Sequence, residues 1–331
     1  MGEGRAEEDP EAEWTALAGT AAFFDELDGE DGPLIVGGPP PSLGMPPIAQ
    51  APMVIDTDAG GDPDDAVALV VAARRVPELV LVVTSDEFGG ERARFVRWLL
   101  DLVGRSDVRV VAGADLGNRR GFVVDGMCPA EVGRQGTDVV GAVSVELAAV
   151  DGRVRWVGMG TLSNLAVLQR ERPELVARMV VTQMGGAIDY RHPERAEHNF
   201  RADPAAVIEL LPTLERWGPA TFVMSDVTFH PAMRLTADSA IYRRWAGTGA
   251  RPWERMLREH FDRWTAKYPA MQHDSLALAA AMLWPGVRFA RERVALDELA
   301  RMRPAVDGIE VALSVSADYS AFMAWLEEGL A

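Results

Sequence analysis

Apolar residues recur from residue 51 onward in short continuous runs that are separated by stretches of helical spacing. The runs predict buried strands at 53–55, 79–84, 108–112, 154–159, 178–184 and 220–225. The intervening stretches predict helices at 65–75, 91–103, 138–149, 163–171 and 204–211, and the tail over 312–330 predicts a late strand and a closing helix. Continuous apolar strands that alternate with helices are typical of a parallel sheet covered on both faces. We therefore predict an α/β fold with a Rossmann-like, mostly parallel central sheet.

The first 50 residues have a different composition. They hold eleven acidic residues against one basic residue, Arg5, and seven of the 21 prolines. This composition predicts an acidic, Pro/Gly-rich N-terminal extension over 1–50 and an α/β domain over 51–331. Within the extension, the apolar spacing over 12–27 predicts a short amphipathic helix, which either lies on its own domain or binds a partner.

Charge and composition narrow the classes of function. The chain has 331 residues, and its 33 Lys+Arg against 50 Asp+Glu give a net charge of −17. Such a chain repels phosphate backbones, and its apolar runs are shorter than the roughly 20 residues that cross a bilayer. The single cysteine, Cys128, and a start without the regions of a secretory signal fit a reducing compartment. We expect a cytoplasmic protein that binds neither nucleic acid nor a membrane.

The loop after the first predicted strand is strongly acidic. Parallel sheets bind ligands beyond the carboxyl ends of their strands, and this loop places five aspartates within ten positions: Asp56, Asp58, Asp62, Asp64 and Asp65. An aspartate at a helix start can cap the helix, which would account for Asp64 or Asp65 but not for all five. Crowded carboxylates repel one another unless a cation or a proton is shared, and oxygen ligands suit Ca²⁺ or Mg²⁺. The pattern favours a divalent metal site over capping alone.

Several segments together resemble one family. The run D-T-D-x-G-x-x-x-D-D-A over 56–66 resembles the signature of the nucleoside hydrolases of the inosine-uridine type, with Asp62 and Pro63 as an apparent insertion. The segments 158–175, 184–186 followed by 196–207, and 273–283 are similar to further family segments in the same order. The resemblance implies hydrolysis of the N-ribosidic bond of a nucleoside or related riboside, a Ca²⁺ cofactor, and assembly as a homodimer or homotetramer.

The resemblance also implies a set of metal ligands. Asp58, Asp65 and Asp274 would bind Ca²⁺ together with the backbone carbonyl of Met159, and the ion would bind the ribose 2′- and 3′-hydroxyls and the attacking water. Asp56 would stand behind these ligands and hold the loop or a ligand in orientation. Three carboxylates, one carbonyl, one water and two hydroxyls give about seven oxygens, a number that suits Ca²⁺.

Two residues would act on the bond itself. Asp64 would be the general base that removes a proton from the metal-bound water, although Asp62 could be an extra ligand or compete for this role. His273 would contact the sugar and help to protonate the leaving base, although a lone histidine is more often structural.

Further residues would bind the substrate. Glu197 and Asn199 match the pair that grips the ribose hydroxyls, or they cap the helix that starts near Asp203. Trp264 and Tyr268 fall where family members carry mobile aromatic residues over the leaving group, or they pack an amphipathic helix.

The base-recognition half of the pocket departs from the family. The asparagine expected after the second strand is missing, and Asp86 or Glu87 could take its place. The stretch 115–136 contains no histidine where the family has an H-G-x-x-G loop. Arg191 or His192 lies where the family has an asparagine, and the arginine is either a solvated loop residue or a fork that grips a phosphate or carboxylate. We therefore expect ribosyl hydrolysis without a standard base preference.

Two other classes of function remain. A phosphohydrolase of the haloacid dehalogenase type would use Asp56 as nucleophile and Asp58 as acid, but Gly60 stands where that signature has Thr or Val. A non-catalytic nucleoside or sugar binder on the same fold would retain the metal and lack turnover. A riboside with a reactive aryl leaving group would separate these classes, because its cleavage needs no base recognition.

Overall fold

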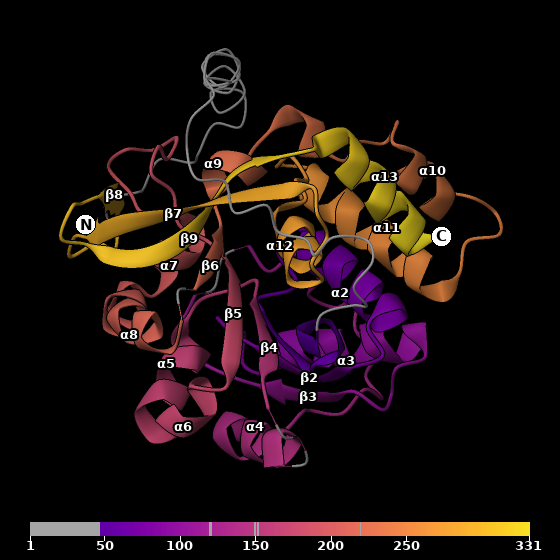
Figure 1. Ribbon diagram of the computed structural model, residues 1–331. Helices are drawn as coiled ribbons and strands as arrows, with labels where there is room; N and C mark the ends of the chain where they lie inside the picture. The colour runs from indigo at the N-terminus through magenta and orange to yellow at the C-terminus, as the bar shows by residue number, and fades with distance from the viewer. Residues whose placement is uncertain (1–46, 119–120, 149, 151, 219) are drawn as a thin grey trace, which may run out of the picture.

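A single sheet organises the molecule (Figure 1). The computed structural model describes residues 47–118, 121–148, 150, 152–218 and 220–331, and in this part of the chain the sheet has nine strands in the order β3-β2-β1-β4-β5-β6-β9-β7-β8. The strands are β1 (Met53–Thr57), β2 (Leu79–Thr84), β3 (Arg109–Ala112), β4 (Val154–Gly158), β5 (Met179–Met184), β6 (Thr221–Val223), β7 (Val287–Leu296), β8 (Met302–Pro304) and β9 (Ile309–Ala317). From β3 through to β9 every pair in this order is parallel, which confirms the mostly parallel sheet.

The strand order reverses at β1. The chain runs outward from β1 to β2 and β3 on one side, and then returns to β4 on the other side of β1 and continues to β5 and β6. Loops that leave β1 and β4 therefore diverge to opposite faces and open a crevice at the carboxyl ends of these strands. The acidic loop follows β1 directly, so it lies at this crevice.

Helices cover both faces of the sheet, as the sequence predicts. One face carries α2 (Asp64–Arg75), α3 (Glu91–Val103), α11 (Pro252–Thr265), α12 (His273–Ala281) and α13 (Tyr319–Leu330), and the other carries α4 (Val139–Ala148), α5 (Ser163–Glu171), α6 (Pro173–Val176) and α8 (Pro204–Trp217). The alternation along β1 shows the two layers, since Met53 and Ile55 pack into the first core and Val54 into the second. The shorter elements are η1 (Pro47–Gln50), α7 (His198–Ala202), α9 (Ser225–Thr228), η2 (Pro231–Met233) and α10 (Ala240–Trp245).

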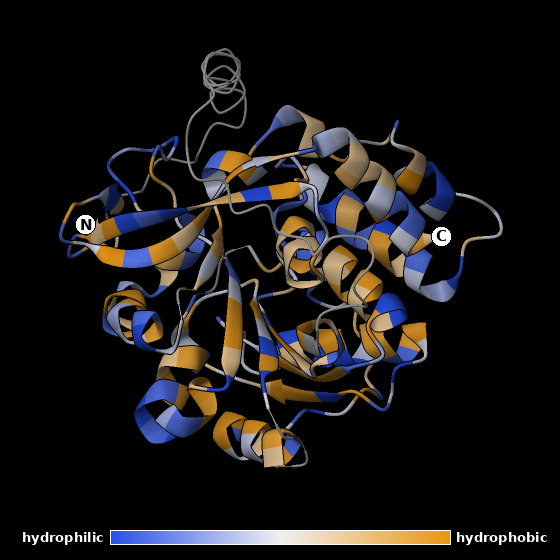
Figure 2. Cartoon of the chain, viewed as in Figure 1, coloured by the Kyte–Doolittle hydropathy of each residue, from blue (hydrophilic) through white to orange (hydrophobic). Residues whose placement is uncertain are grey.

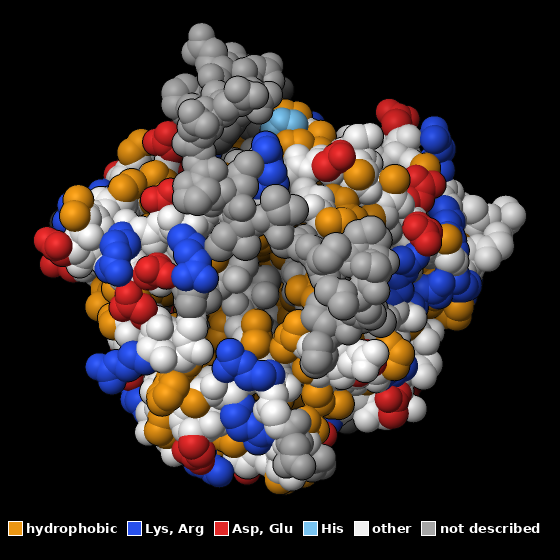
Figure 3. Space-filling model, viewed as in Figure 1, with side chains coloured by type: hydrophobic (Ala, Val, Ile, Leu, Met, Phe, Trp, Pro, Cys, Tyr) orange, Lys and Arg blue, Asp and Glu red, His pale blue; other side chains and the backbone are white. Residues whose placement is uncertain are grey.

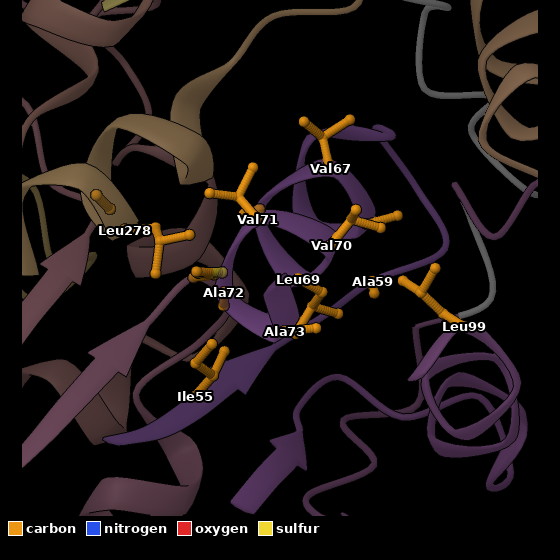
Figure 4. Packing of buried hydrophobic residues seen from close by; sticks show 14 of the residues in the cluster. Ile55, Ala59, Val67, Leu69, Val70, Val71, Ala72, Ala73, Leu99 and Leu278 are labelled. Carbon is orange, nitrogen blue, oxygen red and sulfur yellow. The ribbon is translucent and has the colours of Figure 1, made fainter. Parts of the chain in front are cut away.

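Helix α2 is buried along most of its length. The side chains from Ala66 through Ala72 have no exposed surface. Figure 4 shows Val71 and Ala72 of α2 facing Leu278 of α12, with Ile55 of β1 beneath them. Such packing fixes the position of α2, so the first residues of the helix are held rigidly where the sheet ends.

An antiparallel arm extends the sheet beyond the predicted strands. β7 pairs antiparallel with both β8 and β9, and β9 begins at Ile309, ahead of the predicted strand. Figure 2 shows hydrophilic and hydrophobic residues mixed along this arm. Much of β7 is exposed, so its residues do not form the continuous apolar run that marked the parallel strands.

Some element boundaries differ from the predicted ones. β1 extends to Thr57 because Asp56 and Thr57 remain in the ladder with β2, and α8 continues past residue 211 to Trp217. β6 ends at Val223, and α9 takes over the last predicted strand residue, Ser225. The predicted amphipathic helix over 12–27 and nearly all of the 1–50 extension lie outside the described residues.

The described surface has mixed charge. Figure 3 shows acidic and basic side chains interspersed with apolar ones over the visible face. No helix in the described ranges combines the length and the apolar character that a membrane crossing needs.

Candidate active site at the carboxyl ends of the strands

Three aspartates meet beyond the sheet. Asp64 and Asp65 are the first residues of α2, and Asp274 is the second residue of α12. One carboxylate oxygen from each lies within 4.8 Å of the others. The backbone N–H of Asp274 also donates to Asp64 Oδ2 at 3.1 Å. The acidic loop and the late His-Asp segment, 210 residues apart in the chain, therefore form one cluster, which we call the aspartate cluster.

Polar contacts from the strand ends hold this cluster in place. Thr57 Oγ1 donates to Asp65 Oδ1 at 2.5 Å. Asp56 Oδ1 accepts a hydrogen bond from Asn164 Nδ2 at 3.0 Å, while Asp56 Oδ2 is buried with no hydrogen-bond partner among the described residues. A buried carboxylate oxygen without a partner carries a desolvation cost, which indicates that the site is built to hold a further group.

The charged forms of the buried aspartates are destabilised. Burial raises the pKa of Asp56 to about 8 and that of Asp64 to about 6. Burial also raises the pKa values of Asp62, Asp65 and Asp274 well above their usual range, and repulsion from neighbouring carboxylates adds to each increase. Taking several carboxylates out of water costs free energy that a cation would offset. The cluster therefore has the oxygen donors of a divalent cation site and an uncompensated negative charge that such a cation would neutralise.

A buried arginine that no sequence pattern marks holds the acidic loop. Arg92 of α3 is buried, and its Nη1 donates to the backbone carbonyls of Asp58 and, at 3.1 Å, of Ala59. Its guanidinium also lies 5.5 Å from the centre of the Phe122 ring. An arginine on a helix face carries no pattern of its own, and only the fold shows that its fork reaches this loop.

The apparent insertion is anchored from α11. His260 is fully buried, and its Nε2 lies 2.8 Å from the carbonyl oxygen of Gly61. Burial lowers the pKa of His260 to about 4, so this ring is neutral near pH 7. Asp62 lies in the anchored segment, and its Oδ1 is buried without a hydrogen-bond partner among the described residues. The residue before the insertion is therefore hydrogen-bonded to α11, and the Asp62 side chain is partly buried beside the aspartate cluster.

Met159 and Asn199 connect two strand ends. The Met159 backbone N–H donates to the carbonyl of Asp56 at 2.7 Å, and the Met159 carbonyl accepts from Asn199 Nδ2 at 2.8 Å. Asn199 Nδ2 also donates to the carbonyl of Met184 at 3.1 Å. The Asn199 amide therefore fixes the ends of β4 and β5 relative to each other, and it keeps the Met159 carbonyl beside Asp56.

Glu197 caps a helix at the same edge. Its Oε2 accepts bonds from the backbone N–H groups of Asn199 at 3.0 Å, Phe200 at 3.3 Å and Gly186 at 3.1 Å. The capped helix is α7, whereas the cap of α8 is Asp203. Burial raises the pKa of Glu197. Glu197 therefore does cap a helix, but that helix is α7 and not α8, the helix that the capping alternative named.

His273 is held at the start of α12. Its Nδ1 lies 2.6 Å from Thr228 Oγ1, and its ring is parallel to the Phe229 ring, with 6.1 Å between the centres. Burial lowers the pKa of His273 to about 3. The ring is therefore neutral near pH 7, so it can donate a hydrogen bond from one nitrogen without carrying charge.

A comparison with known protein families identifies the family of the chain. Residues 53–318 match the family described as inosine-uridine preferring nucleoside hydrolases. The chain belongs to this family. Its members hydrolyse N-ribosidic bonds, so the protein is an N-ribohydrolase. Among curated protein sequences, no match was found.

Solved structures share the fold at low sequence identity. The inosine-uridine preferring nucleoside hydrolase from Bacillus anthracis is 18% identical with a TM-score of 0.66, and the match covers 85% of this chain and 99% of that one. The purine-preferring ribonucleoside hydrolase from Gardnerella vaginalis is 20% identical with a TM-score of 0.67, covering 84% and 97%. The type III effector XopQ, solved with adenosine diphosphate ribose, is 18% identical with a TM-score of 0.64, covering 85% and 95%.

The loop before Glu197 places a cation among aromatic rings of this hydrolase. The Arg191 guanidinium lies 4.7 Å from the centre of the Tyr190 ring and 4.2 Å from that of Phe229. His192 meets Tyr190 edge to face, with 5.9 Å between the ring centres. Because Phe229 also stacks on His273, the loop residue Arg191 is only one ring away from the histidine of the site.

Trp264 and Tyr268 lie at the end of α11. Trp264 packs against the core, and its Nε1 donates to the carbonyl of Pro269 at 2.9 Å. The Tyr268 ring centre is 4.7 Å from that of Trp264, and Tyr268 is 38% exposed. Trp264 thus packs against the core, as the second of the two predicted alternatives states. Tyr268 is partly exposed at the surface.

The structure separates the two acids that follow β2. Glu87 caps α3, since its carboxylate accepts backbone N–H bonds of 2.9–3.0 Å from three residues within 88–93. Asp86 instead has the left-handed φ of +46°, and its Oδ2 accepts from Asn118 Nδ2 at 2.7 Å. Asp86 Oδ1 is buried without a partner among the described residues. The Arg92 guanidinium also lies 3.6 Å from Asp86 Oδ2, so Asp86 is buried in an ion pair beside the acidic loop.

Asn164 is a structural residue that we did not single out from the sequence. Besides bonding Asp56, its Nδ2 donates to the carbonyl of Thr84 at 3.0 Å, and its Oδ1 accepts from the Ala114 N–H at 2.9 Å. A Cβ on Gly113 would lie 2.3 Å from Asn164 Oδ1, so the glycine permits this close approach. The signal was present as the asparagine of the family-like segment 158–175, but its partners are visible only in the fold.

Proposed function

We propose that this N-ribohydrolase requires Ca²⁺ and that Asp64 is the general base that removes a proton from the attacking water. The observation that carries the proposal is the aspartate cluster, which joins Asp64 and Asp65 to Asp274. A dehalogenase-type mechanism would give no role to Asp274, and family membership argues against it.

The donor atoms of the site fit a hard divalent ion. Asp58, Asp65 and Asp274, with the carbonyl of Met159, would hold it. The Met159 carbonyl accepts one bond from Asn199 and has a second lone pair for a ligand. A set of oxygens completed by water and sugar hydroxyls exceeds the six that Mg²⁺ prefers, which favours Ca²⁺. When bound, the ion supplies a Lewis acid that increases the acidity of coordinated hydroxyl groups.

Asp64 is suited to the role of general base. Its Oδ2 accepts a hydrogen bond from the Asp274 N–H at 3.1 Å, which holds the carboxylate in a fixed orientation for proton transfer. Cleavage of an N-ribosidic bond passes through an oxocarbenium-like sugar, and the surrounding carboxylates stabilise that positive charge. We assign the proton transfer to Asp64, because it directly precedes the proposed ligand Asp65, and treat Asp62 as its alternative.

The ribose would lie between the aspartate cluster and α7. Asp56 would support the loop from the end of β1. Its buried Oδ2 has no hydrogen-bond partner among the described residues, so it could accept a hydrogen bond from a bound group. The three backbone bonds to Glu197 all reach Oε2, so Oε1 is the atom that would accept a sugar hydroxyl. Asn199 would contribute its Oδ1, because its Nδ2 is used by the Met159 and Met184 carbonyls.

A phosphorylated riboside is a second candidate substrate. The Arg191 guanidinium lies over the rings of Tyr190 and Phe229, and a planar guanidinium binds phosphate in its plane through its edge. One structural neighbour was solved with adenosine diphosphate ribose, which carries two phosphates. His192 lies beside Arg191 and would face the same group. If Arg191 binds phosphate, a nucleoside 5′-monophosphate should have a lower KM than its nucleoside, and Arg191→Gln should abolish that difference.

Our expectations about assembly, location and the aromatic residues rest on the resemblance to the family. We expect a homodimer or homotetramer in the cytoplasm, acting on a small nucleoside or riboside. Trp264 and Tyr268 would contact the leaving group only if the end of α11 moves, because Trp264 is bonded to Pro269. Analytical ultracentrifugation of the purified chain would decide the state of assembly.

One assay tests the activity and its metal requirement. The purified protein is treated with EDTA, dialysed, and assayed on 4-nitrophenyl riboside with and without added Ca²⁺, with Mg²⁺ as the comparison ion. We expect release of nitrophenol that depends on Ca²⁺. Full activity after EDTA would contradict the metal requirement, and ribose binding without any cleavage would favour the non-catalytic binder.

A further inference from the structure

Thr228 lies behind the histidine of the site. It is the last residue of α9, has no exposed surface, and places its hydroxyl oxygen 2.6 Å from His273 Nδ1. The two residues are 45 positions apart, and the sequence offers no pattern that pairs them. The contact therefore became visible only in the fold.

The elements around Thr228 hold its hydroxyl in a defined place. Asp226 of α9 accepts backbone N–H bonds at 3.1 Å and 2.7 Å from Ile188 and Asp189 of the loop before Glu197. On the other side, Tyr319 Oη donates to the carbonyl of Val227 at 3.0 Å. Helix α9 is thus attached to two separate segments, so Thr228 is presented to His273 by a fixed backbone.

The contact selects one tautomer of the neutral ring. A buried hydroxyl that leaves its proton without an acceptor loses stability, and among the described residues the acceptor that lies within bonding distance of the Thr228 hydroxyl is His273 Nδ1. If the ring proton were on Nδ1, that nitrogen would donate to the hydroxyl oxygen, and the hydroxyl proton would lack an acceptor among the described residues. The hydroxyl therefore donates to Nδ1, and the ring carries its proton on Nε2.

We propose that Thr228 is a positioning residue that keeps His273 in the Nε2–H tautomer, so that the neutral ring offers an N–H donor to the leaving group. The His273 ring lies parallel to the Phe229 ring, and the Thr228 hydroxyl determines which ring nitrogen carries the proton. The role rests on the proposed hydrolysis of a riboside, but the tautomer itself does not depend on it.

The proposal predicts a dependence on the leaving group. A nitrogenous base leaves poorly as an anion, so a hydrogen bond to it in the transition state accelerates cleavage. A nitrophenolate leaves readily and gains little from the same bond. Loss of the Thr228 hydroxyl should therefore slow nucleoside cleavage much more than cleavage of 4-nitrophenyl riboside.

The test compares Thr228→Val, which keeps the branched shape, with Thr228→Ser, which keeps the hydroxyl. We expect Thr228→Val to lower kcat on a cleaved nucleoside by about 10- to 100-fold with little change in KM, as is usual when a group orienting an active-site histidine is lost. The effect on 4-nitrophenyl riboside should be much smaller, and Thr228→Ser should restore most of the nucleoside rate. Equal losses on both substrates would show mere structural damage and overturn the proposal.

A spectroscopic measurement on the parent protein gives an independent answer. With ¹⁵N-labelled histidine, and with His273→Gln to assign the signal, the ring nitrogens report directly which one is protonated. We expect Nε2–H in the parent protein and in Thr228→Ser, and a shift toward Nδ1–H or a mixture in Thr228→Val. Nδ1–H in the parent protein would refute the proposal. If the tautomer is as expected but neither riboside is cleaved, the proposed function fails and the tautomer assignment stands.

Discussion

Asp64 lies within the aspartate cluster, and we propose that it acts there as the base rather than as a metal ligand. It is adjacent to Asp65 at the start of α2, yet its own carboxylate accepts a hydrogen bond from the backbone of Asp274. A carboxylate held in this way keeps its orientation when it loses or gains a proton. Asp62, four residues after Asp58, has one buried carboxylate oxygen with no hydrogen-bond partner among the described residues, and we keep it as the alternative base.

Replacement of Asp64 by asparagine should therefore remove the base and preserve the shape of the site. We expect Asp64→Asn to lower kcat by about 10²- to 10⁴-fold, the usual contribution of a general base, while the bound Ca²⁺ remains. Steady-state kinetics on 4-nitrophenyl riboside and metal analysis of the dialysed protein measure both effects. Asp62→Asn is the matched control and should have a much smaller effect on kcat. Equal rates for Asp64→Asn and the parent protein would remove Asp64 from the mechanism.

Gly60 shows how closely the acidic loop is packed. Its φ of +118° is a conformation that side chains with a Cβ rarely adopt, and a Cβ at this position would lie 2.7 Å from the Phe122 ring. We expect Gly60→Ala to distort the loop that carries Asp58 and so to weaken Ca²⁺ binding by at least about tenfold. Gly89 also has a positive φ, of +61°, but a Cβ there would meet nothing within 4 Å, so Gly89→Ala is the control for backbone strain alone. Calorimetric titration with Ca²⁺ compares the two, and equal affinities in all three proteins would contradict this reading of the loop.

At the scale of elements, the site depends on the packing of two helices. Helix α2 supplies Asp64 and Asp65, and α12 supplies Asp274 and His273. The two helices meet through apolar side chains, with Leu278 facing Val71 and Ala72 (Figure 4). The distance between the carboxylates is therefore set by side chains that take no part in the chemistry.

Leu278 has no exposed surface, so its truncation should leave a cavity between α12 and α2. We expect Leu278→Ala to lower the free energy of unfolding by about 2–5 kcal/mol, as measured by urea titration. Val315→Ala, at a residue of β9 that is 42% exposed, should change it by less than about 0.5 kcal/mol. If Leu278→Ala were as stable as Val315→Ala, the helix interface would not be the well-packed support described above.

The elements that the sequence predicted best are those with a continuous apolar signal. The strand over 79–84 and the helices over 91–103 and 163–171 have the predicted bounds, because burial on both faces of a parallel sheet leaves little ambiguity. The antiparallel strands β7 and β8 were not predicted, because half-exposed residues on an edge arm lack that signal. Resemblance to the family placed Asp274 beside the acidic loop, which local patterns cannot do.

The supporting residues of the site were beyond prediction for a different reason. Arg92, His260, Asn164 and Thr228 act through hydrogen bonds to groups far away in the chain. No periodicity or spacing marks such a residue, since its partner depends on the path of the whole backbone. The reactive groups could be proposed from the sequence, whereas the contacts that orient them could not.

At the scale of the whole molecule, the buried acids link stability to pH and to the metal. An unfolded aspartate titrates near 3.9, whereas the folded, metal-free protein holds Asp56 with a pKa of about 8 and Asp64 with a pKa of about 6. The buried His260 and His273 oppose the effect of these carboxyls below about pH 6.5, because burial lowers their pKa values to about 4 and about 3 and only the unfolded state protonates them there. At the two buried carboxyls, the folded state binds more protons than the unfolded state between pH 5.5 and 8. Under that condition the free energy of unfolding decreases as the pH rises. A bound divalent ion reverses the preference, because its ligands must be deprotonated.

The melting temperature should therefore change with pH in opposite directions in the two forms. In EDTA we expect Tm to be higher at pH 5.5 than at pH 8, because the buried carboxyls are neutral at the lower pH and charged at the higher one. With saturating Ca²⁺ we expect Tm to be higher at pH 8, because protons compete with the ion below neutrality. Differential scanning calorimetry measures both slopes, and Asp56→Asn should flatten the slope in EDTA, since it removes a carboxyl whose pKa burial raises to about 8. The same sign of slope in EDTA and in Ca²⁺ would show that the buried acids do not form a metal site.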